Sequence, residues 1–274
     1  MRIAFIASNK DSAGKTISQE LLASGCKDLY LIEGELLLED NLEHTIEGDL
    51  FIFLSKHRSG SNTKSFAVHS IGNWHDAKAG GKEKTLCPSS AILQHHMFKE
   101  LYARQREGYE VTMEATHHGP YTEKPAIFVE VGSTEEEWQD PINGKIIAES
   151  VIAAIEKSRN ATQHTDNEHQ KNNQNERKQK EKQIVAIGLG GPHYCNNFNK
   201  LSLRKNYAFA HICPKHHLQY MDEDMLGQAI EKTNEKVESI VLDWKGLGKE
   251  KQRILEMIQK TGIKIERTDQ LLKD

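Results

Sequence analysis

The sequence lacks a long apolar run, paired cysteines and an excess of charge of one sign. No apolar stretch approaches the ~20 residues that a membrane-spanning helix needs, so we expect no membrane anchor. The four cysteines are scattered without CxxC spacing, which favours reduced thiols in the cytoplasm. The first residues lead directly into a strand-like run, without the charged leader and apolar segment of a secretion signal. The net charge of −4 argues against a nonspecific nucleic-acid binder, so we expect no DNA partner, and a local basic patch stays open.

The chain does contain enough apolar sequence to bury a core, at 37% of 274 residues. Short apolar runs alternate with helical patterns from Ile3–Ala7 to Ile263–Ile265. This alternation predicts an α/β fold, a layered sandwich around a mixed, largely parallel sheet. Residues 158–183 are almost devoid of apolar side chains, and we expect a disordered insertion there. We therefore expect a single domain over residues 1–274, interrupted by this insertion, and a monomer.

The first apolar run is followed by Gly14-Lys15-Thr16 and a helical pattern, which is the layout of a phosphate-binding loop. The full pattern GxxxxGK[ST] requires glycine at position 9, where this chain has Asn9. A later strand-like run ends at Asp243, which resembles a magnesium-holding aspartate. These features keep a nucleotide-binding protein open as an alternative function.

The most informative motif is Glu114-Ala115-Thr116-His117-His118-Gly119-Pro120, which follows the apolar run Val111–Met113. It predicts a buried strand that ends in a loop, and ligands bind at the carboxyl ends of strands in open α/β sheets. Histidine and carboxylate together suit either a zinc site or general acid/base chemistry. The alternative is a surface loop with one packed and one solvated histidine.

Three other stretches place a histidine near the end of an apolar run, at His57, His69 and His193. A single pocket built from several strand ends would explain this repetition. Glu130 lies within an apolar strand, so it either faces that pocket or pairs with a buried base. Lys56 and Arg58 flank His57 beside small hydroxyl residues, which suits a phosphate or a terminal ribose, although a solvated loop is the alternative.

Together these segments make the sequence similar to the archaeal and plant type of D-aminoacyl-tRNA deacylase, the D-tyrosyl-tRNA deacylase family. The matching stretches occur in one order along nearly the whole chain, at residues 55–57, 67–73, 114–120, 128–133, 190–194, 211–215 and 243–246. The chain departs from the family at Cys195-Asn196-Asn197, where the family tends to have Ala-Pro-Arg. An RNA or carboxylate contact made by that arginine is therefore in doubt.

The resemblance implies a zinc-dependent enzyme with a fold similar to peptidyl-tRNA hydrolase and the purine phosphorylases. Its substrate would be D-aminoacyl-tRNA, and its reaction would be hydrolysis of the ester to the 3′-terminal ribose. This reaction frees the D-amino acid and returns tRNA for use in translation. A metal-free mechanism assisted by the tRNA 2′-hydroxyl stays open, and so does a tRNA-binding module without turnover.

We assign expected roles to the matching residues as follows. Water activation and proton transfer are expected of Glu114, His117, His118 and His193. The expected zinc ligands are His69, His117, His118 and His193. Contacts to the tRNA 3′ end are expected of Lys56, His57, Arg58, Asn73, Tyr194, Lys215 and Lys245.

Overall fold

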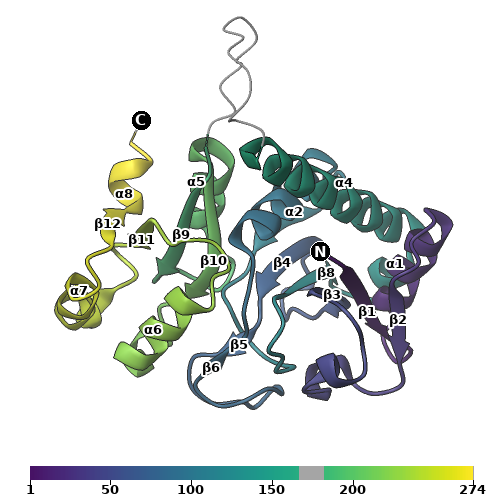
Figure 1. The fold of residues 1–274 in the computed structure, drawn as a ribbon, viewed down its shortest axis with the longest axis horizontal. Coiled ribbons are helices and arrows are strands. Elements are labelled where there is room, and N and C mark those ends of the chain that lie inside the picture. The colour runs from purple at the N-terminus through teal and green to yellow at the C-terminus, as the bar shows by residue number, and fades with distance from the viewer. Residues whose placement is uncertain (167–181, 274) are drawn as a thin grey trace, which may run out of the picture.

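The computed structural model describes residues 1–166 and 182–273 (Figure 1). The strands are β1 Ile3–Ser8, β2 Leu29–Ile32, β3 Leu50–His57, β4 Ser65–Ser70, β5 Gly72–Asn73, β6 Thr85–Leu86, β7 Glu110–Met113, β8 Ala126–Gly132, β9 Ile184–Leu189, β10 Tyr207–Cys213, β11 Ser239–Leu242 and β12 Lys264–Arg267. The α-helices are α1 Ser12–Ala23, α2 Ala91–Ala103, α3 Glu135–Gln139, α4 Pro141–Asp166, α5 Asn196–Lys205, α6 Glu223–Glu231, α7 Lys251–Gln259 and α8 Thr268–Leu271. Short 3₁₀ helices occur at Leu36–Leu38, Leu42–His44, Leu218–Tyr220 and Gly248–Glu250.

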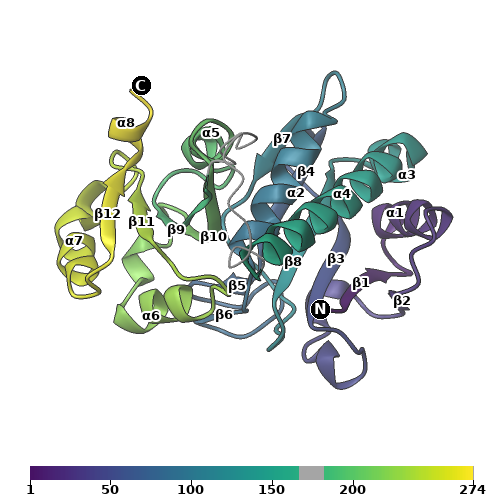
Figure 2. The same cartoon turned by 45° about the horizontal axis from the view of Figure 1, so that its top comes forward.

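The larger sheet has six strands in the order β2-β1-β3-β8-β4-β7. Its strands pair in parallel except for β4 and β8, which are antiparallel. The central strands β1, β3 and β8 are buried along almost their whole length, as their continuous apolar sequences require. Helices α1, α2 and α4 pack together on one side of this sheet (Figures 1 and 2). The predicted mixed, largely parallel α/β architecture is confirmed.

A second sheet has four parallel strands in the order β10-β9-β11-β12. The prediction of one sheet was therefore too simple, because an apolar run indicates a strand but not its pairing partner. Helix α2 contacts both β4 and β10, and one apolar core contains Val68 of the first sheet and Phe209 of the second. The two sheets thus share buried surface, and the number of domains stays a prediction.

The segment that follows β7 joins the ends of both sheets. The backbone N–H of Glu114 donates to the carbonyl oxygen of Val68 in β4 (3.1 Å), and that of Thr116 donates to the carbonyl oxygen of Ile212 in β10 (3.0 Å). Between them, the N–H of Ala115 donates to the carbonyl oxygen of His193 (2.8 Å). This segment therefore lies where strands of both sheets end, as expected for a ligand site in an α/β fold.

The predicted disordered insertion at 158–183 begins too early. Helix α4 continues to Asp166, so residues 158–166 are helical, and residues 167–181 lie outside the described part of the chain. The upstream half of α4 is anchored by buried Ile147 and Val151, and extending a formed helix requires little additional free energy per residue. Polar composition alone therefore did not identify the helix end.

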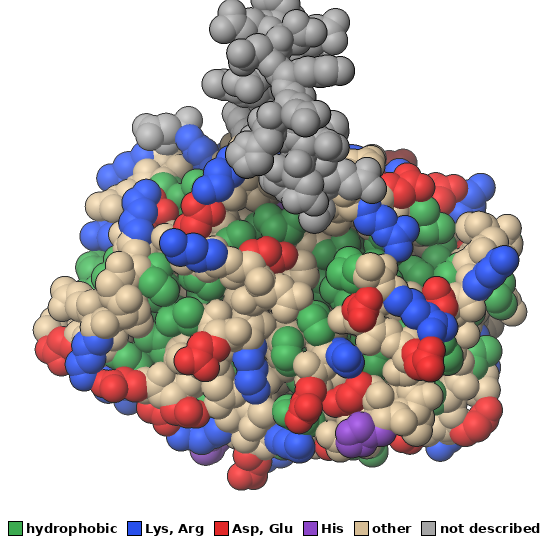
Figure 3. Space-filling model, viewed as in Figure 1, with side chains coloured by type: hydrophobic (Ala, Val, Ile, Leu, Met, Phe, Trp, Pro, Cys, Tyr) green, Lys and Arg blue, Asp and Glu red, His purple; other side chains and the backbone are tan. Residues whose placement is uncertain are grey.

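Lys and Arg side chains are interspersed with Asp and Glu over the face shown in Figure 3. Within residues 1–166 and 182–273, no helix combines the length and apolar character that crossing a bilayer demands.

Candidate active site

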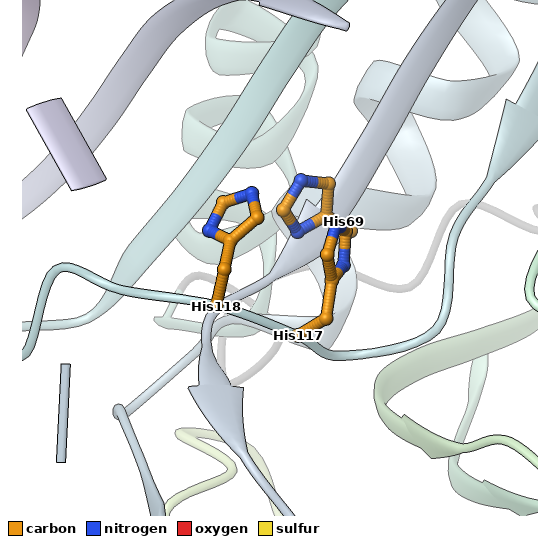
Figure 4. Close-up of side chains that lie close together, drawn as sticks. All are labelled: His69, His117 and His118. Carbon is orange, nitrogen blue, oxygen red and sulfur yellow. The ribbon is translucent and has the colours of Figure 1, made fainter. Parts of the chain in front are cut away.

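Seven titratable side chains converge where the two sheets meet. They come from the end of β3, from β4, from β8, from the segment after β7 and from the loop after β9: His57, His69, Glu130, Glu114, His117, His118 and His193. Figure 4 shows that His117 and His118 rise side by side from one loop, next to His69. The shared pocket predicted from separate motifs therefore exists.

Glu114 connects three of the histidines. Its Oε1 lies 3.3 Å from Nδ1 of His57, and its Oε2 lies 3.3 Å from Nε2 of His193. The same Oε2 lies 3.7 Å from Nε2 of His117. Neither oxygen has a hydrogen-bond partner by strict geometry within the described residues, although the side chain is fully buried. A buried carboxylate with this environment requires a cation or protonated imidazoles beside it.

Glu130 lies near His57 and near the two histidines of the cluster that Glu114 does not contact, so it faces the pocket. Its Oε2 lies 3.3 Å from Nδ1 of His57 and 3.8 Å from Nε2 of His69, and its Oε1 lies 4.0 Å from Nε2 of His118. Burial would raise the pKa of Glu130, but the adjacent His57 and His69 outweigh burial and lower it. Burial likewise opposes the charged forms of His57 and His69, and the carboxylates raise both pKa values. Glu130 thus pairs with buried bases at the site.

His69, His117 and His118 share one hydrogen-bonding arrangement. Each directs Nδ1 at a backbone carbonyl oxygen, at 3.0, 2.8 and 2.6 Å respectively. A carbonyl only accepts, so each Nδ1 carries the hydrogen and a neutral ring keeps its lone pair on Nε2. Burial and neighbouring histidines lower the pKa of His117 well below its usual value and that of His118 to about 3. Their ligand atoms lie within 4.8 Å of one another, which suits a shared metal ion.

A cavity of about 520 Å³ opens beside this cluster. Its wall includes His57, His117, His118, His193 and Glu130. The rest of the wall is formed by Ser8, Asp11, Glu35, Leu36, Leu37, Ser55, Lys56 and Arg58. Of these residues, only Lys56 and Arg58 were predicted as site residues. Asp11 lies between Asn9 and Gly14, in the stretch that has the layout of a phosphate-binding loop. Leu36 and Leu37 lie in a 3₁₀ helix, and a pair of leucines carries no functional signal.

Lys56, Arg58 and Tyr194, which are predicted to contact the tRNA 3′ end, lie beside the cluster. The cationic groups of Lys56 and Arg58 lie 5.7 and 5.5 Å from the ring centroid of Trp138. The hydroxyl of Tyr194 lies 3.4 Å from Nε2 of His57 and 3.1 Å from Oγ of Ser59. These side chains place positive charge and an aromatic ring at the edge of the cavity.

The other predicted RNA contacts are placed differently. Asn73 is buried, and its amide donates to the carbonyl oxygens of Gly80 (2.8 Å) and Lys82 (3.2 Å), which holds a loop in place. Lys215 and Lys245 are exposed and follow β10 and β11 in the second sheet. They do not line the cavity, so any RNA contact they make lies outside it.

The structure contradicts the phosphate-binding loop. Helix α1 begins at Ser12, and Oδ1 of its N-cap Asp11 accepts the N–H of Gly14 (2.8 Å), so a carboxylate occupies the place where a phosphate would bind. Gly14 permits close packing, since a Cβ there would lie 2.7 Å from the carbonyl oxygen of Leu54. Asp243 belongs to the other sheet and accepts a hydrogen bond from Asn197 (2.9 Å).

The fold and the site together define an α/β enzyme whose cavity is bordered by histidine–carboxylate pairs. The model of the D-aminoacyl-tRNA deacylase family matches residues 44–266. The D-aminoacyl-tRNA deacylase of Methanocaldococcus jannaschii is 36% identical over 280 residues, covering 97% of this chain and 100% of that protein. The chain belongs to the D-aminoacyl-tRNA deacylase family.

Two further similarities agree with this membership. The D-aminoacyl-tRNA deacylase of Ignicoccus hospitalis is 33% identical over 267 residues, covering 97% of this chain and 99% of that protein. A crystal structure described as a conserved protein of unknown function superimposes with a TM-score of 0.84 at 27% identity, covering 100% of this chain and 97% of the other. The fold is therefore shared along the whole chain.

Proposed function

We propose that this chain hydrolyses the ester bond of D-aminoacyl-tRNA, releasing the D-amino acid and free tRNA, with zinc as its resident metal. The observation that supports a bound metal is the arrangement of His69, His117 and His118. All three donate Nδ1–H to backbone carbonyls, so all three offer Nε2 as a ligand atom at one place. Backbone carbonyls commonly fix metal-binding histidines in this tautomer.

The donor set fits zinc, which favours imidazole and carboxylate ligands. Nε2 of His69 is buried without a hydrogen-bond partner among the described residues, and a cation shared with His117 and His118 would satisfy it. Both oxygens of Glu114 are likewise buried without a partner there, and Glu114 groups with His117 and His193. His193 is the fourth predicted ligand, and it groups with Glu114 and His117 rather than with His69. When bound, zinc supplies a Lewis acid that polarises a carbonyl and lowers the pKa of water.

The chain's own residues supply the proton transfers. Oε2 of Glu114 lies 3.3 Å from Nε2 of His193, and the imidazole of His193 lines the cavity. His193 would take the proton of the attacking water at Nδ1 and return it to the ribose 3′-oxygen as the ester breaks. His57, charged between Glu114 and Glu130 and lining the cavity, would stabilise the negative oxygen of the tetrahedral intermediate.

The cavity has space for the two parts of this substrate. Leu36 and Leu37 give it an apolar wall suited to an amino-acid side chain. Lys56 and Arg58 give it two cations suited to a phosphate of the tRNA 3′ end. A cytoplasmic location and a monomeric state stay predictions.

The test is hydrolysis of D-tyrosyl-tRNA and L-tyrosyl-tRNA by purified protein, with chelator and with zinc restored. We expect loss of the D-ester alone, stopped by chelator and recovered with zinc. D-selective loss that ignores the chelator would keep the reaction and remove zinc from it. Stability of both esters would overturn the proposed reaction.

A further inference from the structure

A group of exposed and half-buried rings lies outside the catalytic cluster, next to the loop that carries His193. The rings of His75 and Tyr220 are stacked, with centroids 3.7 Å apart and an interplanar angle of 5°. The ring of His217 meets Tyr220 edge-on at 6.2 Å, and His216 meets His217 edge-on at 4.4 Å. We call the first pair the His75–Tyr220 stack.

The stack is not part of a hydrophobic core. Tyr220 is 37% exposed and belongs to none of the apolar clusters of the described residues, and His75 is half-buried. An aromatic pair that packs a core is normally buried, whereas this pair presents ring surface to solvent. Its position therefore requires an explanation other than stabilisation of the fold.

The backbone beneath the stack is held in place from two sides. The guanidinium of Arg253 donates to the carbonyl oxygens of Leu218, the first residue of the 3₁₀ helix that ends at Tyr220, and of Met221, which follows that helix. The N–H of Lys84 donates to the carbonyl oxygen of His75 (2.8 Å). The rings are thus pre-organised, which reduces the entropy lost when a ligand binds.

The stack adjoins the catalytic site through the loop after β10. The N–H of Lys215 donates to the carbonyl oxygen of Gly191 (2.9 Å), in the glycine loop that leads to His193. The exposed Lys215 adds positive charge beside the rings.

We propose that the His75–Tyr220 stack binds an unpaired base of the tRNA 3′ end, while Lys215 contacts the adjoining phosphate. This inference rests on the proposed function, which brings that single strand to the neighbouring cavity. Single-stranded RNA is recognised by stacking of splayed bases on aromatic and histidine rings, with cations along the backbone. A protein partner would instead need a broader apolar surface than two stacked rings.

The test compares binding of two RNAs, uncharged tRNA and the same tRNA lacking its unpaired 3′ nucleotides. Tyr220→Ala should weaken binding of intact tRNA by about 5- to 150-fold and leave binding of the shortened tRNA unchanged. Tyr220→Phe should bind as the unmodified protein does, because it keeps the ring. Tyr102→Ala removes an equally exposed tyrosine (43%) from helix α2 and is the matched control.

Equal affinities of Tyr220→Ala and unmodified protein for intact tRNA would overturn the inference, as would equal weakening on both RNAs. If circular dichroism shows that Tyr220→Ala fails to fold, His75→Ala replaces it with the same expected results. With D-tyrosyl-tRNA, Tyr220→Ala should raise KM and retain kcat. If tRNA binding depends on Tyr220 but the unmodified protein leaves the ester intact, the proposed reaction fails and the proposed role of the stack stands. The two failures can therefore be told apart.

Discussion

Two groups of buried histidines in this molecule have different surroundings. His95 of α2 and His211 of β10 are 1% and 0% exposed, and their Nδ1 atoms lie 2.7 Å from the hydroxyl of Ser202 and 3.4 Å from that of Thr116. Burial lowers the pKa of each to about 3, so both are neutral at pH 7. The histidines of the catalytic cluster are also largely buried, but they surround two carboxylates.

Burial alone therefore does not distinguish a site from a core. His118 has a pKa near 3, as His95 does, yet of the two it is His118 that lies near a carboxylate, Glu130. A hydroxyl satisfies one imidazole nitrogen and completes a local hydrogen bond. A buried carboxylate adds a charge that several imidazoles or a metal ion must balance. Glu114 and Glu130 thus give the cluster its capacity for chemistry.

Removing the shared carboxylate should have the largest effect. Glu114→Gln keeps the shape of the side chain but removes the charge that orients His193, so we expect kcat/KM for D-aminoacyl-tRNA to fall by about 10²- to 10⁴-fold. Single-turnover ester hydrolysis measures this loss. Glu137→Gln is the control, because Glu137 is equally buried but caps α3 and pairs with Lys64 at 2.9 Å. Comparable losses in the two variants would contradict the special role of Glu114.

Removing a proposed ligand nitrogen should lower the zinc content of the protein when the histidine belongs to the catalytic cluster, and should not when it is His95. His118→Asn retains a donor for the carbonyl of Gly119 and tolerates the left-handed backbone at φ 47°, but it lacks Nε2. We expect at least tenfold weaker zinc binding, measured by mass spectrometry of metal content and by competition with a chelator. The same change at His95 should leave zinc binding unaltered. Full zinc content in His118→Asn would remove this residue from the ligand set.

Acid should lower the stability of the fold through His95, a buried histidine without a carboxylate beside it. The folded pKa of His95 is about 3, and its unfolded value is near 6.5, so the unfolded chain binds an additional proton between these values. Stability is therefore lost as pH falls from about 6.5 toward 3, at about 1.4 kcal/mol per pH unit. His95→Asn should be less stable at pH 7, and its free energy of unfolding should fall less steeply with acid. Parallel slopes in denaturant titrations at pH 6 and 5 would contradict this assignment.

Much of the cluster could be predicted from sequence, because each histidine follows an apolar run and strand ends meet at one edge of a sheet. Glu130 was detectable for a related reason, since a charged side chain within a buried strand requires a partner. The Thr-x-x-Glu spacing of Thr134 and Glu137 is typical of a capping box, and this capping box is present. These features depend on neighbours in sequence or on a rule about strand direction.

Features that depend on long-range pairing could not be predicted. The division into two sheets depends on which strands pair, and helix α5 begins after Cys195 in a left-handed conformation (φ 53°) that its Asn-rich start did not indicate. Asn73 lies in a motif typical of the family, but its amide holds the loop at Gly80. Asp11 lines the cavity because β3 lies beside α1, where Ser55 donates to its Oδ2 (3.0 Å).

The smallest expected effects concern the cations of the second sheet, which lie outside the cavity. Lys215→Ala and Lys245→Ala should each weaken tRNA binding a few-fold without changing kcat, since an exposed lysine that meets a phosphate contributes mainly through counterion release. The measurement is the slope of log affinity against log salt concentration, which should become shallower by ~0.7 for each single-strand phosphate that a lysine no longer neutralises. Lys249→Ala, an exposed lysine of the same sheet region, serves as the control for a general change in charge. If all three variants reduce the slope equally, only net charge matters; if only Lys215→Ala reduces it, the RNA follows the loop beside the His75–Tyr220 stack and does not reach β11.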